Sequence, residues 1–316
     1  MDSKIKHIDK SQFERIGLDK SDIKTVSGQN TSYWKDAFRR LSMNKAAIAA
    51  LVIIIIITLF SIFVPAFSPY TISEQHLGHT YAPLGFRDPT DGHMHLFGTD
   101  SLGRDIFTRV WYGGRISLFI SFSAVLINFI IGIIYGGISG YAGGVVDNIM
   151  MRIIEIINGI PYLIIVILLM MVLPAGTMTM VIAYATVGWT GMARLVRGQI
   201  MSLKEQDYVV AAKVMGARPA RIITKHLLPN TLSVVIVNIT LSIPSAIFTE
   251  AFLSYIGLGV PVPLASWGTL ANEGSRVFQM YPSQLIIPAI CISLTMLSFN
   301  LLGDGLRDAL DPRLRK

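Results

Sequence analysis

Five long stretches of this chain contain no charged residue, and they constrain its fold more than any other feature. They are residues 46–73, 116–146, 156–193, 227–249 and 277–303. The hydrocarbon core of a bilayer is about 30 Å thick, and about 20 consecutive apolar residues cross it as a helix. Only 15% of the residues are charged, against about 25% in soluble domains. We therefore expect an all-α polytopic membrane protein rather than a soluble, disordered or fibrous one.

Six membrane-spanning helices are predicted, because the third stretch is too long for one crossing. Leu173-Pro174-Ala175-Gly176 divides it with a turn signature. The glycines between residues 136 and 144 are expected to end the second helix in a short turn. Pro161, Pro244 and Pro288 fall inside predicted spans, where each is either a hinge or static. The predicted spans are residues 46–64, 116–138, 149–172, 178–194, 231–256 and 284–303.

The distribution of lysine and arginine predicts the orientation of the chain. Lysine and arginine accumulate in the short cytoplasmic loops of membrane proteins. With the N-terminus inside, 22 of the 27 basic residues lie on the cytoplasmic side. Both termini are then cytoplasmic, and the formal net charge of +7 reflects topology rather than nucleic-acid binding. The five basic residues placed outside are Arg87, Arg104, Arg109, Arg115 and Arg276.

The segments that flank the spans follow from this orientation. Residues 1–45 are expected to form a cytoplasmic tail, disordered over residues 1–30. Trp34, Phe38 and Leu41 have helical spacing among basic residues, which indicates an interfacial helix contacting membrane lipid, with a disordered basic tail as the alternative. The remaining divisions are a first transmembrane helix at 46–64, an extracellular loop at 65–115 and a cytoplasmic tail at 306–316.

The loop at residues 194–230 is too long for a simple connector. Residues 208–216 are compatible with a helix, on which Ala212 and Gly216 lie one turn apart and predict an edge open to close packing. A second helix is expected to start at Pro219 and to end before the fifth span. The pattern predicts a helix-turn-helix that docks a cytoplasmic partner. Amphipathic helices lying on the bilayer surface are the alternative.

The same loop resembles a known motif. Ala211-Ala212-x3-Gly216-x9-His226-Leu227-Leu228-Pro229 is similar to the EAA loop in the membrane subunits of bacterial ABC importers, with Val210 at the position of the motif's glutamate. Glu205 or Asp207 are candidates to supply the missing carboxylate. The motifs that accompany it are FGTDSLGRD (97–105), YGGRISL (112–118), ARLVRGQ (193–199), LSYIGLG (253–259) and GDGLRDALDPRLR (303–315).

Together these motifs resemble the C-type permease of oligopeptide and dipeptide importers, from about Trp34 to the C-terminus. The resemblance implies a type I ABC importer transmembrane domain over residues 112–305, with five helices and the loop at 194–230 coupling it to the ATPases. It also implies a location in the bacterial cell membrane. The residues that it places in ATPase coupling are Ala211, Ala212, Met215, Gly216, Ala217, Arg218, His226 and Pro229.

The resemblance further implies half of a translocation pathway and no enzymatic activity. A homologous second permease and two ATPases, which carry ATP and Mg, are the implied partners, and an extracellular binding protein delivers the substrate. The chain itself is expected to bind no cofactor, and it contains no G-x-x-x-x-G-K-[ST] phosphate loop. Peptide import is favoured, with nickel or another small solute as the alternative.

Glu250 is the acid that lies deepest in an apolar run, where a carboxylate must face the protein interior, a partner or water. It and Pro244 are candidates for the pathway, and a structural carboxylate at the interface between permeases is the other interpretation of Glu250. Arg152 and Glu155, three residues apart near the inner end of the third span, are expected to form a salt bridge.

The outer loop contains two further groups of polar residues. Four histidines at this spacing could bind zinc, copper or nickel, but a polar loop also collects histidine by chance, and no metal site is predicted. These histidines are His76, His79, His93 and His95. Asp100, Arg104 and Asp105 either contact the binding protein or attach the loop to the outer helix ends.

Two other classes of function fit the sequence less well. An intramembrane enzyme would need a nucleophile or metal group at membrane depth, yet there is no G-x-S-x-G and no histidine within the spans, and Cys291 is the single cysteine. No catalytic residue is therefore expected. A simple channel would leave the loop at 194–230 without a purpose.

Overall fold

The computed structural model describes residues 33–89 and 92–311, so the prediction for residues 1–30 lies outside it. A 3₁₀ turn at Leu77–His79 and two π-helical turns at Ile223–Leu227 and Ser254–Leu258 accompany the regular helices. The α-helices are α1 (Tyr33–Met43), α2 (Lys45–Phe67), α3 (Ile106–Ala142), α4 (Gly144–Gly159), α5 (Tyr162–Val172), α6 (Thr177–Leu203), α7 (Asp207–Val214), α8 (Pro219–Ile222), α9 (Leu228–Leu253), α10 (Trp267–Arg276) and α11 (Ser283–Leu310).

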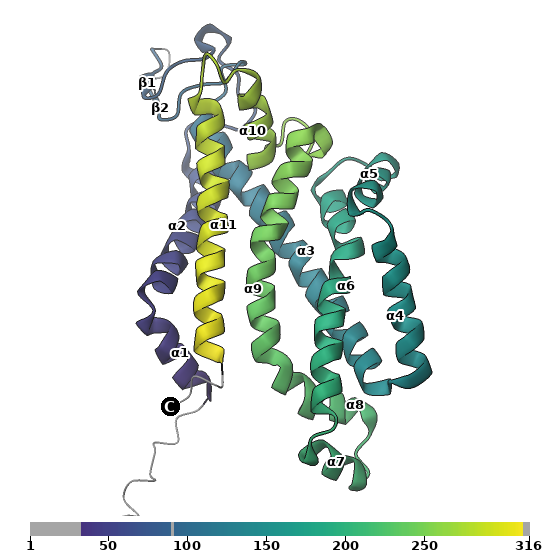
Figure 1. Ribbon diagram of the computed structural model, residues 1–316. Helices are drawn as coiled ribbons and strands as arrows, with labels where there is room; N and C mark the ends of the chain where they lie inside the picture. The colour runs from purple at the N-terminus through teal and green to yellow at the C-terminus, as the bar shows by residue number, and fades with distance from the viewer. Residues whose placement is uncertain (1–32, 90–91, 312–316) are drawn as a thin grey trace, which may run out of the picture.

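The long helices agree with an all-α membrane protein. Helices at Lys45–Phe67, Ile106–Ala142, Pro219–Leu258 and Ser283–Leu310 are long and apolar enough to cross a bilayer, and α4 with α5 forms a further, bent pair. Helix α6 has 27 residues and lies within the same bundle, although it is less apolar (Figure 1). The arrangement is compatible with the predicted six spans.

Helix α3 lies at the centre of the bundle, where it packs along α6, α2 and α9, while α11 packs on α9 and α2 (Figure 1). Its first turn is capped by Asp105, whose side chain accepts a hydrogen bond from the Thr108 backbone N–H at 2.7 Å. The main core contains Trp267, which is fully buried and donates from Nε1 to the Val110 carbonyl at 2.9 Å. This bond fixes α10 against the N-terminal part of α3.

The second span extends past its expected end near residue 138, although the expected glycine turn is present. Helix α3 continues to Ala142, and the turn follows at Gly143 and Gly144, both with positive φ. A Cβ on Gly136 would lie 2.3 Å from the Ala193 carbonyl oxygen, and one on Gly140 would lie 2.8 Å from that of Arg197. These glycines therefore serve close packing between α3 and α6 rather than helix termination.

Three prolines differ in what they do to the backbone. At Pro161 the predicted third span breaks into α4 and α5, which are bent by 79°. Pro244 and Pro288 lie inside α9 and α11, which continue through them. The second helix of the loop also does not end before the fifth span, because α8 runs into α9 through the π turn at Ile223–Leu227.

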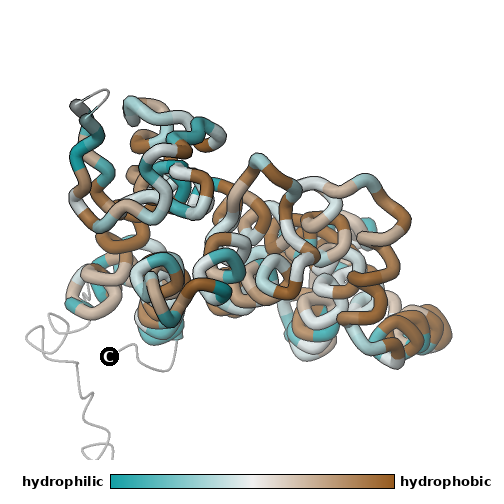
Figure 2. The backbone as a smooth tube through the Cα atoms, turned by 90° about the horizontal axis from the view of Figure 1, so that it is seen from above, coloured by the Kyte–Doolittle hydropathy of each residue, from teal (hydrophilic) through white to brown (hydrophobic). Residues whose placement is uncertain are grey.

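The segment between α2 and α3 covers one end of the bundle together with α10. It contains a short antiparallel pair, β1 (Phe86–Arg87) and β2 (Met94–His95). Figure 2 shows hydrophilic residues gathered in this segment and hydrophobic residues prevailing over the opposite side of the bundle. We call residues 68–105 the cap segment.

Candidate coupling hairpin and buried polar clusters

Helices α7 and α8 form a hairpin at the end of the bundle opposite the cap segment (Figure 1). We call residues 207–222 the α7–α8 hairpin. Gly216 follows α7 with φ +78°, a left-handed conformation that glycine adopts without steric cost. The next residue, Ala217, donates its backbone N–H to the Ala212 carbonyl at 3.0 Å, and Pro219 begins α8. Glycine and proline therefore fix the turn in the way the sequence pattern indicates.

The inner face of the hairpin is anchored in a hydrophobic cluster. Val209 and Ile222 are fully buried, and Ala212 is 5% exposed. They pack with Val196 and Ile200 of α6 and with neighbouring residues of α9. The hairpin is therefore attached firmly to two long helices, and a displacement of the hairpin is transmitted to both.

The outer face of the hairpin carries large apolar side chains that no other described residue covers. Val214 is 82% exposed, Met215 79% and Val210 46%. An apolar group of this kind on a soluble loop marks a surface for a partner or for lipid. Val210, at the position of the motif's glutamate, thus belongs to the exposed apolar group. In the described part of the chain neither Glu205 nor Asp207 forms an ion pair.

The predicted edge of Ala212 and Gly216 is only half correct. Ala212 faces the interior of its own chain, whereas Gly216 is exposed, and a Cβ added to it would have no atom within 4 Å. Sequence spacing alone puts the two residues on one face, but the helix ends at Val214, so Gly216 leaves its axis. Among the other predicted coupling residues, Ala211, Met215, Arg218 and Pro229 are exposed, and Ala217 and His226 are half-buried.

Glu250 is buried inside the chain, at 2% exposure, in the last turn of α9. Its Oε1 accepts a hydrogen bond from Ser254 Oγ at 2.8 Å, and the hydroxyls of Ser117 and Ser266 lie nearby. A small cavity of about 10 Å³ adjoins it. The carboxyl is thus held among hydroxyl groups of three segments. Pro244, also buried, lies on the same helix.

Three charged residues of the cap segment belong to buried ion pairs. Asp100, Arg104 and Asp105 are each at most 5% exposed. Arg104 Nε donates to Asp100 Oδ2 at 2.7 Å, and Arg109 of α3 contacts the same carboxylate. Of the two roles left open for this block, the geometry shows the attachment of the loop to the helix ends.

A second cluster in the cap segment surrounds Asp88, which is fully buried. Its carboxylate lies 3.2 Å from His76 Nδ1, 3.5 Å from His79 Nε2 and 3.8 Å from His95 Nε2. His93 is exposed. In residues 33–89 and 92–311, no group of three or more His, Cys, Asp or Glu side chains is placed to hold a metal ion. Sequence reasoning missed Asp88, since a single aspartate in a polar loop carries no signal.

Comparison with known proteins places this architecture in a family. Residues 102–316 match the family model described as "Binding-protein-dependent transport system inner membrane component". Residues 32–83 match "N-terminal TM domain of oligopeptide transport permease C". The fold also resembles a chain of the MetNI methionine ABC transporter in an inward-facing conformation, with a TM-score of 0.53 and 19% identity, over 64% of this chain and 96% of that one.

Curated relatives agree over nearly the whole length. The oligopeptide transport system permease protein OppC of Bacillus subtilis is 49% identical, covering 99% of this chain and 100% of that protein. The dipeptide transport system permease protein DppC of the same organism is 50% identical, over 92% and 89%. OppC of Escherichia coli K12 is 42% identical, over 91% and 93%. The chain belongs to the inner membrane components of binding-protein-dependent transport systems, and within them to the C-type permeases of the oligopeptide and dipeptide group.

Proposed function

We propose that this chain forms half of the pathway of an importer for oligopeptides or dipeptides. As a permease of an ABC importer, it works with a partner permease and with ATPases, and it is not itself an enzyme. Relatives named for oligopeptide and dipeptide transport, similar over nearly their full length, support a peptide substrate. Nickel or another small solute remains the alternative that a substrate assay must test.

The observation that carries the coupling role is the division of the α7–α8 hairpin into two faces. Val209, Ala212 and Ile222 fasten it to α6 and α9, while Val214 and Met215 are free to enter a partner. We assign the outer face to one of two ATPases, which bind ATP and Mg, and no cofactor to this chain. When the ATPases close, the hairpin would move, and α6 and α9 would move with it and alter access to the pathway.

The proposed orientation places the α7–α8 hairpin and both termini in the cytoplasm. The basic residues of the inner segments favour it. The cap segment then faces the outside, where an extracellular binding protein delivers the peptide. The buried ion network of Asp100, Arg104 and Arg109 holds the cap segment on the helix ends. The cap segment would therefore offer the binding protein a rigid surface.

The test is uptake of a labelled peptide by vesicles that contain the complete importer. Met215→Asp should reduce uptake on the order of tenfold or more, because losing a central apolar anchor of an interface costs about 2 kcal/mol or more. The number of ATPases recovered with the complex should fall as well. Thr224→Asp, an exposed position beyond α8, is the matched control and should keep both. Normal uptake in Met215→Asp would contradict the coupling role, and uptake of Ni²⁺ without peptide would contradict the substrate.

A further inference from the structure

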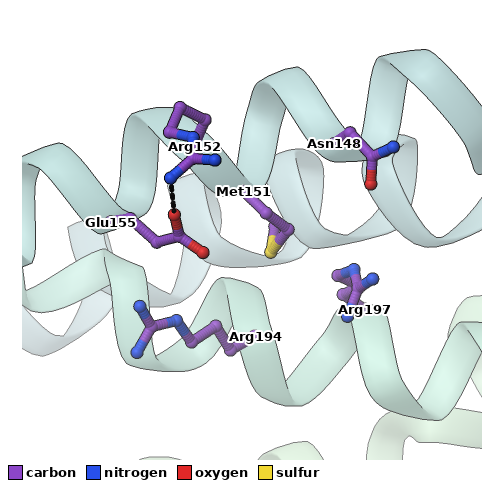
Figure 3. Close-up of a pocket in the computed structure, with 6 residues that line it drawn as sticks. All are labelled: Asn148, Met151, Arg152, Glu155, Arg194 and Arg197. Atoms are coloured by element: carbon purple, nitrogen blue, oxygen red, sulfur yellow. Dashed lines mark hydrogen bonds and ion pairs between the residues drawn. The ribbon is translucent and has the colours of Figure 1, made fainter.

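A polar pocket of about 660 Å³ lies between α4 and α6, in the half of the bundle that carries the α7–α8 hairpin. Figure 3 shows Asn148, Met151 and Glu155 projecting from α4 toward α6, with Arg194 and Arg197 opposite them. Helix α4 on one side of the pocket is the first half of the bent apolar pair formed with α5. Its lining residues are Asn148, Met151, Arg152, Glu155, Arg194 and Arg197.

The charges of the pocket do not balance. Arg152 Nη1 donates to Glu155 Oε2 at 2.9 Å, and Arg197 is held by the buried carboxylate of Asp147. Arg194 is exposed and forms no ion pair with the described residues. The Arg194 guanidinium, which Figure 3 shows on the Glu155 side of the pocket, is therefore left to attract an anion.

The pairing of Arg197 adds rigidity to this site. Asp147 also accepts a hydrogen bond from Ser139 of α3, so three helices meet at one carboxylate. The spacing between α4 and α6 is thus fixed on the inner side of the pocket. Arg194 lies one turn before Arg197 on α6. Its backbone is therefore held in place, while its guanidinium forms no ion pair with the described residues.

The outer side of α4 is strongly apolar. Ile156 is 63% exposed, Ile149 58% and Ile153 44%. This surface begins where the polar stripe of Asn148, Arg152 and Glu155 ends, so one helix presents a polar and an apolar strip side by side. A soluble anion needs only the first strip, whereas a phospholipid uses both, with its phosphate at the arginines and its acyl chains along the isoleucines.

We propose that the pocket binds the phosphate of an anionic phospholipid of the cytoplasmic leaflet. Guanidinium groups bind phosphate oxygens in a bidentate manner, and basic pockets between spanning helices on the cytoplasmic side recognise anionic head groups. The assignment of the leaflet rests on the proposed function, which places the α7–α8 hairpin in the cytoplasm. The phosphate chemistry is shared with free inorganic phosphate, and the experiment separates these two sources.

The experiment measures the thermal unfolding midpoint of the purified, delipidated importer as phosphatidylglycerol, phosphatidylcholine or inorganic phosphate is added. Phosphatidylglycerol should raise the midpoint in a saturable manner, and phosphatidylcholine should not. Arg194→Gln should weaken the apparent affinity for phosphatidylglycerol about fivefold, since each basic residue near an anionic surface contributes about 1 kcal/mol. The control Arg307→Gln removes an exposed arginine at the same end of the bundle, outside the pocket, and should leave the affinity unchanged.

Equal affinity in Arg194→Gln and in the unmodified importer would overturn the site. A midpoint shift of the same size with inorganic phosphate would overturn the assignment to a lipid. The readout needs no transport, so a failure of peptide uptake, which would contradict the proposed function, is recorded separately from a failure of lipid binding.

Discussion

Arg109 of α3 binds both carboxylate oxygens of Glu273 in α10, with Nη1 2.7 Å from Oε2 and Nη2 3.1 Å from Oε1. The two residues are 164 positions apart in the chain. Arg109 is 1% exposed and also contacts Asp100 of the cap segment. One arginine therefore joins the cap segment, α3 and α10 on the side proposed to receive the binding protein.

Removing this arginine should destabilise the end of the bundle that carries the cap segment. Arg109→Gln leaves the buried Asp100 without one of its two cationic partners, and breaking a buried pair costs on the order of 3 kcal/mol. A lower unfolding midpoint of the purified complex is the expected result. Arg276→Gln, an exposed arginine of the same α10, should change stability by no more than about 0.5 kcal/mol. Equal midpoints for the two variants would contradict the structural role of Arg109.

Close packing of α3 on α6 gives a second prediction. Gly136→Ala should destabilise the protein by about 1 to 3 kcal/mol, because overpacking forces the helices apart. Its Cβ would lie 2.3 Å from a backbone oxygen, which cannot move as a side-chain tip can. The unfolding midpoint of the purified protein measures the effect.

The matched control for Gly136 is Gly198 of α6, where a Cβ would meet no atom within 4 Å. Gly198→Ala should be neutral or stabilise by up to about 1 kcal/mol, since alanine favours a helix over glycine. If both alanine variants unfold at the same temperature, the contact between α3 and α6 at Gly136 is not tight enough to exclude a Cβ.

The sequence was sufficient for the features that depend on local composition. Long uncharged stretches indicate spanning helices because the bilayer excludes charge, and Pro219 marks a helix start because it lacks an N–H. For Pro161 the sequence left a hinge and a static residue as alternatives, and the structure shows a break between α4 and α5. The motifs around Ala211 and Asp105 identified the family, and the comparisons confirm it.

Features that depend on which faces meet were beyond the sequence. Gly136 reads as a helix breaker and Ala212 as an exposed small residue, but both are buried against α6. Helices distant in the chain decide which face of a helix is buried. In addition, a short helix with small residues on both faces has no periodic pattern that would indicate the buried face. The partners of Arg109 and Asp88 were equally invisible, because a charge paired through the fold looks in sequence like any surface charge.

Topology can be tested with single cysteines in a Cys291→Ser background. Leu84, which is 58% exposed, lies in the cap segment, and Ser202 is exposed near the C-terminal end of α6. An impermeant thiol reagent applied to intact cells should label Leu84→Cys and leave Ser202→Cys unlabelled, and opening the cells should expose the second. Labelling of Ser202→Cys from outside would reverse the proposed orientation.

Gly216 provides a prediction that separates backbone strain from partner contact. Its φ of +78° is unfavourable for residues with a Cβ, at a cost of about 1 to 2 kcal/mol, and asparagine tolerates it better. Gly216→Ala should therefore reduce recovery of the ATPases, and Gly216→Asn should reduce it less. No atom of residues 33–89 and 92–311 outside its immediate neighbours lies within 4 Å of the added Cβ, so a clash with these residues contributes nothing.

The size of the side chain at position 216 then reports on the ATPase. If a partner packs against this turn, Gly216→Leu should lose more uptake and more ATPase than Gly216→Ala, although both disturb the backbone alike. In the isolated permease, where the position is open, the two variants should have the same unfolding midpoint. The test measures copurification of the ATPases together with that midpoint. If Gly216→Ala and Gly216→Leu lose equal amounts of ATPase, position 216 acts only through its backbone. The docking surface would then be confined to Val214, Met215 and their neighbours on α7.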